Sequence, residues 1–199
     1  MPAVCVFCAS SEAIDPRYLD LAAEVGAELA RRGHRLVSGG GRVSCMGAVA
    51  RAARAGGAYT VGVIPQALVD LEVADHDADE LVVTADMRSR KSEMDRRSDG
   101  FLALPAGLGT LEEMLEIWVA RTLGLHAKPL VVLDPDDFYG PLRIQVGRLL
   151  EGGFVRPAAL EAIAWAGTVP EAFDLLEAGW SAPAPGNLPS VEDVLESEP

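Results

Sequence analysis

The stretch Gly100-Phe-Leu-Ala-Leu-Pro-Ala-Gly-Leu-Gly-Thr-Leu-Glu-Glu113 joins an apolar run, a glycine turn and the start of an amphipathic helix. The apolar run predicts a buried strand, and the pattern that begins at Thr110 predicts a helix. Gly107 and Gly109 have no Cβ, so their backbone N–H groups can approach a ligand closely. Because a helix N-terminus offers unpaired N–H groups and a positive dipole end, this turn favours a phosphate.

The same alternation of apolar runs and amphipathic stretches extends along most of the chain. We predict strands over 3–8, 34–37, 59–64, 81–84, 100–104, 129–133 and 162–166, and helices over 15–32, 46–55, 86–98, 110–123, 137–150 and 169–178. This order predicts an α/β fold, a doubly wound parallel sheet with helices on both faces. Ligands of such folds bind at the carboxyl ends of strands. We predict one domain over 1–180 and a disordered, acidic, Pro-rich tail over 181–199.

Composition narrows the function classes. The chain has 199 residues, enough for one domain with a full core, and a formal net charge of -13. Such an acidic chain is poorly suited to nucleic acid or to an anionic membrane surface, so we expect neither partner. The N-terminus lacks the basic region of a signal peptide and no apolar run reaches transmembrane length, so we expect a cytoplasmic protein.

The cysteines and histidines give little sign of a metal or redox site. Cys5 and Cys8 have the Cys-x-x-Cys spacing but lie in a strand-like run, where we expect buried thiols that point to opposite faces. Glu72 and His76 are the nearest approach to a metal pair, short of the four ligands of a structural zinc site. We therefore expect no metal ion and no organic cofactor.

A second glycine turn, Ser38-Gly-Gly-Gly41, also lies between a predicted strand and a predicted helix. The Gly-x-Gly-x-x-Gly order of dinucleotide-binding proteins fails at Ser44, and the Gly-Lys-Ser/Thr of a P-loop is absent. The turn is either a simple tight turn or a contact for phosphate or ribose through Gly40 and Gly41. We favour the ligand contact.

Two polar features permit a structural and a functional interpretation. The segment Asp86-Met-Arg-Ser-Arg-Lys91 places three cations at a helix N-terminus, where the dipole disfavours them. They form either a solvated face or an anion contact. Thr110 and Glu113 have the spacing of a capping box, in which Glu113 returns to the Thr110 N–H. Spacing alone favours capping over catalysis for Glu113, although the two roles are compatible.

Three segments in register resemble a known family. They are Gly-Gly-Gly-x-x-x-x-Met-Gly from Gly39, Met-x-x-Arg-Lys from Met87, and Pro-x-Gly-x-Gly-Thr-x-x-Glu from Pro105. Together they resemble the "lonely guy" family of cytokinin riboside 5′-monophosphate phosphoribohydrolases, whose members are often labelled lysine decarboxylases. The resemblance implies a Rossmann-like homodimer that hydrolyses the N-glycosidic bond of a nucleoside 5′-monophosphate, giving free base and ribose 5-phosphate.

The resemblance also implies roles for individual residues. The catalytic arginine and glutamate fall on Arg90 and Glu113. The other substrate contacts fall on Glu72, Lys91, Gly107, Leu108, Gly109, Thr110, Leu111 and Glu112. The expected substrate is a cytokinin nucleotide or AMP; the alternatives are a phosphoribohydrolase for another base and a non-catalytic nucleotide-binding or carrier protein.

The chain departs from the family pattern at two of these turns. Ala106 replaces a usual glycine, and the usual Val-Gly-Leu-Met-Gly is Val43-Ser-Cys-Met-Gly47. An alanine at a position that needs a positive φ would be strained and would tilt the loop.

Overall fold

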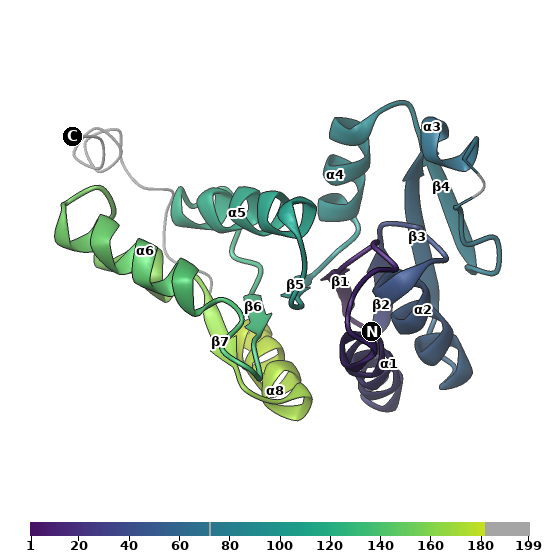
Figure 1. Ribbon diagram of the computed structural model, residues 1–199, viewed down its shortest axis with the longest axis horizontal. Helices are drawn as coiled ribbons and strands as arrows, with labels where there is room; N and C mark the ends of the chain where they lie inside the picture. Colours follow the sequence, from purple (N-terminus) through teal and green to yellow (C-terminus); the bar gives the residue numbers. More distant parts are fainter. Residues whose placement is uncertain (72, 182–199) are drawn as a thin grey trace.

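The computed structural model describes residues 1–71 and 73–181, and a seven-stranded sheet runs through it (Figure 1). Its strands are β1 (Ala3–Phe7), β2 (Arg35–Ser38), β3 (Thr60–Pro65), β4 (Glu80–Thr84), β5 (Gly100–Ala103), β6 (Leu130–Leu133) and β7 (Ala164–Ala166). They lie in the order β4-β3-β2-β1-β5-β6-β7, and each neighbouring pair is parallel. The predicted doubly wound α/β fold is confirmed.

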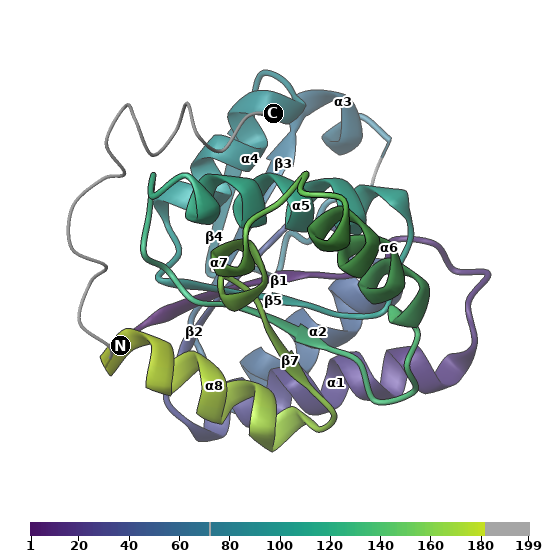
Figure 2. The same cartoon turned by 90° about the vertical axis from the view of Figure 1, so that its left-hand side faces the viewer.

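Helices cover both faces of the sheet (Figure 2). One layer contains α1 (Pro16–Arg31), α2 (Ser44–Ala55) and α8 (Val169–Ser181); the other contains α4 (Met87–Arg96), α5 (Leu108–Thr122) and α6 (Gly140–Glu151). Two short helices, α3 (Gln66–Val69) and α7 (Pro157–Glu161), were not predicted. Because β1 lies between two helix layers, all five of its residues are buried, as the continuous apolar run of a central parallel strand requires.

The strand order places a crevice in the middle of the sheet. β1 pairs with β2 on one side and with β5 on the other, so the order reverses between β1 and β5. The connections that leave these two strands diverge toward opposite halves of the sheet. Parallel folds bind ligands at this switch point, beyond the carboxyl ends of the strands.

The start of α5 differs from the prediction. The helix begins at Leu108 with Gly107 as its N-cap, and in the described part of the chain no side chain caps it. The predicted capping box is therefore wrong: Thr110 is already inside the helix and buried. Within α5, Leu115 is 40% exposed, whereas Ile117 is buried.

The remaining predictions concern the cysteines and the ends of the fold. Cys5 and Cys8 are free, buried and packed in opposite helix layers, as predicted. Ser181, predicted to begin the tail, is the last residue of α8, and residues 182–199 lie outside the described part. Within residues 1–71 and 73–181, no helix is both long and apolar enough to cross a membrane.

Candidate active site

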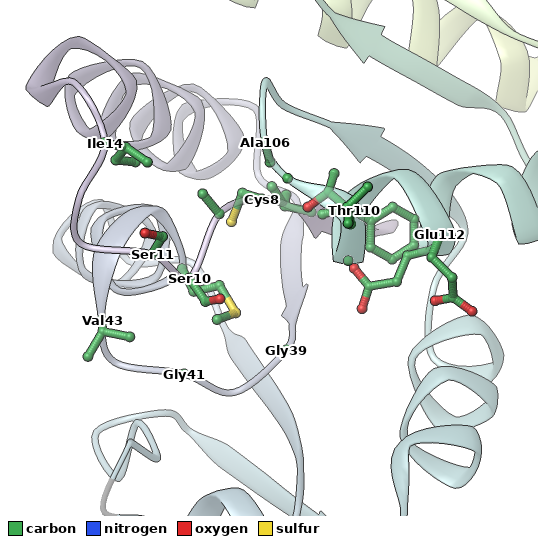
Figure 3. Close-up of a pocket in the computed structure, with 18 of the residues that line it drawn as sticks. Cys8, Ser10, Ser11, Ile14, Gly39, Gly41, Val43, Ala106, Thr110 and Glu112 are labelled. Atoms are coloured by element: carbon green, nitrogen blue, oxygen red, sulfur yellow. The ribbon is translucent and has the colours of Figure 1, made fainter. Parts of the chain in front are cut away.

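A cavity of about 720 Å³ opens at the switch point of the sheet. Figure 3 shows walls from the segments that follow β1, β2 and β5. Residues of β3 and α3, of α4 and of the segment after β6 complete the lining. The residues that line it include Ser10, Ser11, Ile14, Tyr18, Gly39, Gly41, Val43, Met46, Arg90, Gly107, Leu108, Gly109, Thr110, Glu112, Glu113 and Phe138. The cavity therefore brings both glycine turns to one site.

Arg90 and Glu113 form a buried ion pair at this cavity. Nη1 of Arg90 donates to Oε1 of Glu113 at 2.8 Å, and the two side chains are 9% and 12% exposed. Nε of Arg90 donates to the Val63 carbonyl of β3 at 3.1 Å. The guanidinium is therefore held between a strand and a helix, and it fixes the carboxylate in turn.

Burial changes the acidity of the glutamate. Desolvation raises the pKa of Glu113 above its usual range, and the neighbouring Arg90 guanidinium opposes that rise. The arginine thus favours the ionised carboxylate in a position where burial disfavours it. A carboxylate held in this way can stabilise positive charge that develops in a bound substrate.

The first glycine turn makes room for the arginine. A Cβ on Gly39 would lie 1.9 Å from Nη2 of Arg90, so a side chain there would displace the guanidinium. Gly40 has a φ of +71 and packs against β3, where a Cβ would lie 3.0 Å from Cβ of Ile64. A Cβ on Gly41 would lie 2.8 Å from Cε of Met46. Gly41 lines the cavity and Gly40 lies behind it; their predicted contact with phosphate or ribose stays a prediction.

The second glycine turn leaves the N-terminus of α5 open. Gly107 is exposed and extended, with φ -85 and ψ -164, and among the residues that the structure describes no side-chain hydrogen bond caps the helix. By contrast, the Asp86 carboxylate caps α4 by accepting from the Ser89 N–H at 2.8 Å. A Cβ on Gly107 or Gly109 would meet no other atom within 4 Å. The first N–H groups of α5 therefore lie beside open space in the cavity wall.

Four residues predicted to contact substrate or phosphate do not line this cavity, or cannot be placed. Nζ of Lys91 pairs with Glu112 and, at 2.5 Å, with Oε2 of Glu116. These hydrogen bonds, the one to Glu112 foremost, raise the pKa of Lys91. Leu111 packs against the core and Gly40 against β3. Glu72 lies outside the described residues.

The two departures from the family pattern have different consequences. In the described part of the chain, the non-glycine residues with positive φ are Ser44 and Asp137. Ala106 is therefore free of the strain that would have tilted its loop. Ser44 instead carries the unusual backbone, with a φ of 50.

Sequence reasoning missed the parts of the site that follow β1 and β6. The buried Tyr139 hydroxyl donates to the Leu104 carbonyl at 2.8 Å, at the end of β5 where the glycine turn begins; burial raises the pKa of Tyr139 to about 12. Phe138 meets the Tyr18 ring edge-on, with centroids 6.1 Å apart. Phe138 and Tyr139 follow the carboxyl end of β6, and this position was the available signal.

Comparisons with known proteins agree with the resemblance in the sequence. A family model described as "Possible lysine decarboxylase" matches residues 46–176. The cytokinin riboside 5′-monophosphate phosphoribohydrolase of Mycobacterium tuberculosis is 53% identical over 160 residues, which are 80% of this chain and 85% of that protein. The enzyme of the same name from Arabidopsis thaliana, LOG3, is 41% identical over 174 residues, 87% of this chain and 81% of that protein.

Solved structures give the same fold at low sequence identity. The molybdenum cofactor binding protein of Rippkaea orientalis has a TM-score of 0.68 at 21% identity, covering 89% of this chain and 96% of its own. The molybdenum cofactor carrier protein of Chlamydomonas reinhardtii has a TM-score of 0.67 at 21% identity, covering 91% and 99%. The structural likeness shows the fold, and the sequence matches show that this chain belongs to the family of the cytokinin riboside 5′-monophosphate phosphoribohydrolases.

Proposed function

We propose that this protein hydrolyses the N-glycosidic bond of a nucleoside 5′-monophosphate, a cytokinin nucleotide or AMP, to free base and ribose 5-phosphate. The observation that carries the proposal is one cavity with two features, the buried Arg90–Glu113 pair and the open N-terminus of α5. The pair suits the cleavage of a glycosidic bond, and the helix end suits the phosphate. The phosphoribohydrolase names of the relatives support the same reaction.

The phosphate binds at the start of α5 in this proposal. The N–H groups of Leu108, Gly109 and Thr110 are the first of the helix, and the buried Thr110 hydroxyl is beside them. Unpaired amides and the helix dipole together attract an anion. Because Gly107 and Gly109 carry no side chain, the phosphate can come close to the backbone.

Glu113 stabilises the transition state. As the bond from C1′ to the base nitrogen breaks, its electrons leave with the base and the ribose becomes oxocarbenium-like, with positive charge near C1′. The Glu113 carboxylate stabilises that charge and orients the incoming water. Water then adds to C1′, and one of its protons is lost to the departing base or to solvent. The products are ribose 5-phosphate and neutral base.

Arg90 acts on both partners of the reaction. Its hydrogen bonds to Val63 and Glu113 fix the carboxylate in one orientation. Its positive charge also opposes the negative charge that develops on the departing base. Removing Arg90 therefore loses both the position and the ionisation of Glu113.

The test is the release of free base, followed by chromatography, from AMP and separately from isopentenyladenosine monophosphate. We expect release by the unmodified protein and a loss of about a hundredfold or more in Glu113→Gln and Arg90→Ala. Glu24→Gln, which removes an exposed carboxylate of α1, is the matched control and keeps the full rate.

The outcome separates the proposal from its alternatives. Tight binding of nucleotide with no release of base from any nucleoside monophosphate would contradict hydrolysis and favour a binding or carrier protein. Release from a nucleotide of a different base alone would keep the reaction and change the substrate. Full activity in Glu113→Gln would contradict the role of the glutamate.

A homodimer is part of the proposal. α5 and its C-cap residue Leu123 expose large apolar side chains: Leu115 is 40% exposed, Val119 56% and Leu123 39%. Ile144 of α6 is 61% exposed, and Phe154, which follows α6, is 63% exposed. Apolar surface of this kind suits a self-complementary contact between two copies. Sedimentation equilibrium tests whether the protein is a dimer. We propose that the dimer is located in the cytoplasm.

A further inference from the structure

Ser44 is strained at the entrance to α2. Its φ of 50 lies in the left-handed region, which a residue with a Cβ rarely adopts. It is the first residue of the helix and is buried. Strained backbone persists where surrounding contacts hold it, and it clusters at functional sites. The contacts of Ser44 therefore indicate what the strain accomplishes.

Two hydrogen bonds tie the first turn of α2 to the connection between β1 and α1, and a third ties it to the first turn of α1. The Ser44 hydroxyl donates to the Ser11 carbonyl at 2.5 Å. The Met46 N–H donates to the Ala9 carbonyl at 3.4 Å, and the Cys45 thiol donates to the Tyr18 carbonyl at 3.3 Å. The Ser44 bond is the shortest of the three. We call residues 9–14 the β1–α1 loop.

The β1–α1 loop forms one wall of the cavity. Ser10, Ser11 and Ile14 line the cavity, and Figure 3 shows them across it from Thr110 and Glu112. The loop is exposed from Ser10 to Ala13, so little packing holds it in place. The hydrogen bond from Ser44 therefore contributes more to the position of this wall than a single hydrogen bond contributes within a packed core.

The end of the cavity beside this loop is largely apolar. Ile14, Val43, Met46 and Phe138 line it, with Tyr18 edge-on against Phe138. In the proposed function the phosphate lies at α5 and the glycosidic bond lies at the Arg90–Glu113 pair. The base is then directed to the remaining, apolar end, where planar aromatic groups bind well.

We propose that Ser44 is a positioning residue, which holds the β1–α1 loop through the Ser11 carbonyl and so shapes the binding site for the base. The inference rests on the proposed function for the direction in which the nucleotide lies. In this proposal Ser44 acts through the loop and does not touch the reacting atoms. Loosening the loop should weaken binding of the whole nucleotide and leave binding of ribose 5-phosphate, which has no base, unchanged.

Two substitutions separate the hydroxyl from the backbone strain. Ser44→Gly removes the hydroxyl and relieves the strain, because glycine accepts a positive φ. Ser44→Ala removes the hydroxyl and keeps the strain. Any property that depends on the bond to Ser11 changes in both variants. Global stability falls further in Ser44→Ala, which makes Ser44→Gly the variant for binding measurements.

The first measurement is hydrogen exchange at the Met46 amide, which donates to the Ala9 carbonyl of the loop. Loss of one hydrogen bond should speed this exchange about tenfold in both variants, relative to amides of β6. Ser10→Ala removes a hydroxyl from the same loop without touching the Ser44 bond, and it should leave the exchange rate unchanged. Unchanged exchange in Ser44→Gly would overturn the proposal.

The second measurement is calorimetry on the Glu113→Gln protein, which prevents turnover. Adding Ser44→Gly should raise the Kd of AMP about tenfold and change the Kd of ribose 5-phosphate less than about twofold. Equal weakening of both ligands, or of neither, would overturn the proposal. This binding result does not depend on hydrolysis, so failure of the unmodified protein to release base would contradict the proposed function alone.

Discussion

The two glycine turns of this protein share a sequence pattern and differ in what fills them. Each follows a strand and precedes a helix. Beside Gly39 the room is taken by the guanidinium of Arg90, and the Met46 N–H at the start of α2 donates to the Ala9 carbonyl. Beside Gly107 and Gly109 a Cβ would meet nothing within 4 Å. The turn at residues 39–41, which we call the filled turn, makes room for the protein's own atoms. The turn at residues 106–109, which we call the open turn, leaves room for a ligand.

The comparison explains why the two helix ends differ in chemistry. Both helices have the same dipole, but at α2 the loop between β1 and α1 contacts the first turn and accepts its hydrogen bonds. Neither helix has a side-chain N-cap, and within residues 1–71 and 73–181 no loop carbonyl accepts from the first N–H groups of α5. An anion that enters the cavity therefore finds unpaired amides at α5. The filled turn positions the cationic partner of Glu113, so the two turns serve one site in different ways.

Substitution in the filled turn carries the largest expected effect. In Gly39→Ala the new Cβ would lie 1.9 Å from Nη2 of Arg90, so the guanidinium leaves its place beside Glu113. Since a misplacement of about 1 Å can cost about a hundredfold in rate, we expect kcat to fall at least that far. Base release under saturating nucleotide measures it. Gly147→Ala, whose Cβ would meet no atom within 4 Å, is the control; an unchanged kcat in Gly39→Ala would show that this position of Arg90 is dispensable.

Substitution in the open turn should separate stability from binding. Gly109 is inside α5 and its φ is not positive, so Gly109→Ala should stabilise the fold by about 0.5–1 kcal/mol. The added methyl projects into the space proposed for the phosphate, and we expect the Kd of ribose 5-phosphate to rise about tenfold or more. Urea unfolding and calorimetry measure the two quantities. Unaltered affinity would mean that the phosphate binds elsewhere.

The carboxylate of Glu113, which pairs with Arg90, gives a pH dependence. Burial raises the pKa of Glu113, and the proposed mechanism needs its ionised form, so kcat/KM should fall with decreasing pH through a value above the ordinary glutamate range. Stability has the opposite sign: a carboxyl with a raised pKa in the folded state favours folding below its unfolded pKa, and this contribution is lost as pH rises through the folded pKa. Base-release rates test the predicted fall of kcat/KM, and urea unfolding tests the predicted change in stability. Both are measured from the usual glutamate pKa upward and compared with Glu113→Gln. A fall of kcat/KM at the usual glutamate pKa would contradict the prediction for activity.

Sequence patterns were sufficient for the fold, because strand and helix periodicities depend on neighbours in the chain. The strand predicted over 81–84 begins only one residue earlier, at Glu80. The parallel order then located the crevice without any knowledge of side-chain contacts. The spacing of Thr110 and Glu113 misled the local interpretation, because Glu113 instead pairs with Arg90, 23 residues away in the sequence.

Which glycine turn is filled could not be predicted from the sequence. The contact between Gly39 and Arg90 joins segments far apart in the chain, and periodicity carries no information on it. The same holds for the Val63 carbonyl that anchors Arg90. The family pattern pointed to a departure at both turns, but only backbone geometry shows that the strain lies at Ser44 and not at Ala106.

That distinction gives the prediction with the smallest expected effect. Ala106 lies in the open turn without a positive φ, and its side chain packs against the core. Ala106→Gly restores the residue usual in the family pattern, yet it relieves no backbone strain. It also increases the conformational entropy of the unfolded chain, which favours unfolding. We therefore expect stability to fall by about 0.4–1 kcal/mol and kcat/KM to change less than about twofold. Urea unfolding and base release measure the two; a large gain in activity would mean that the methyl group of Ala106 obstructs the phosphate, so that the second turn is less open than its glycines indicate.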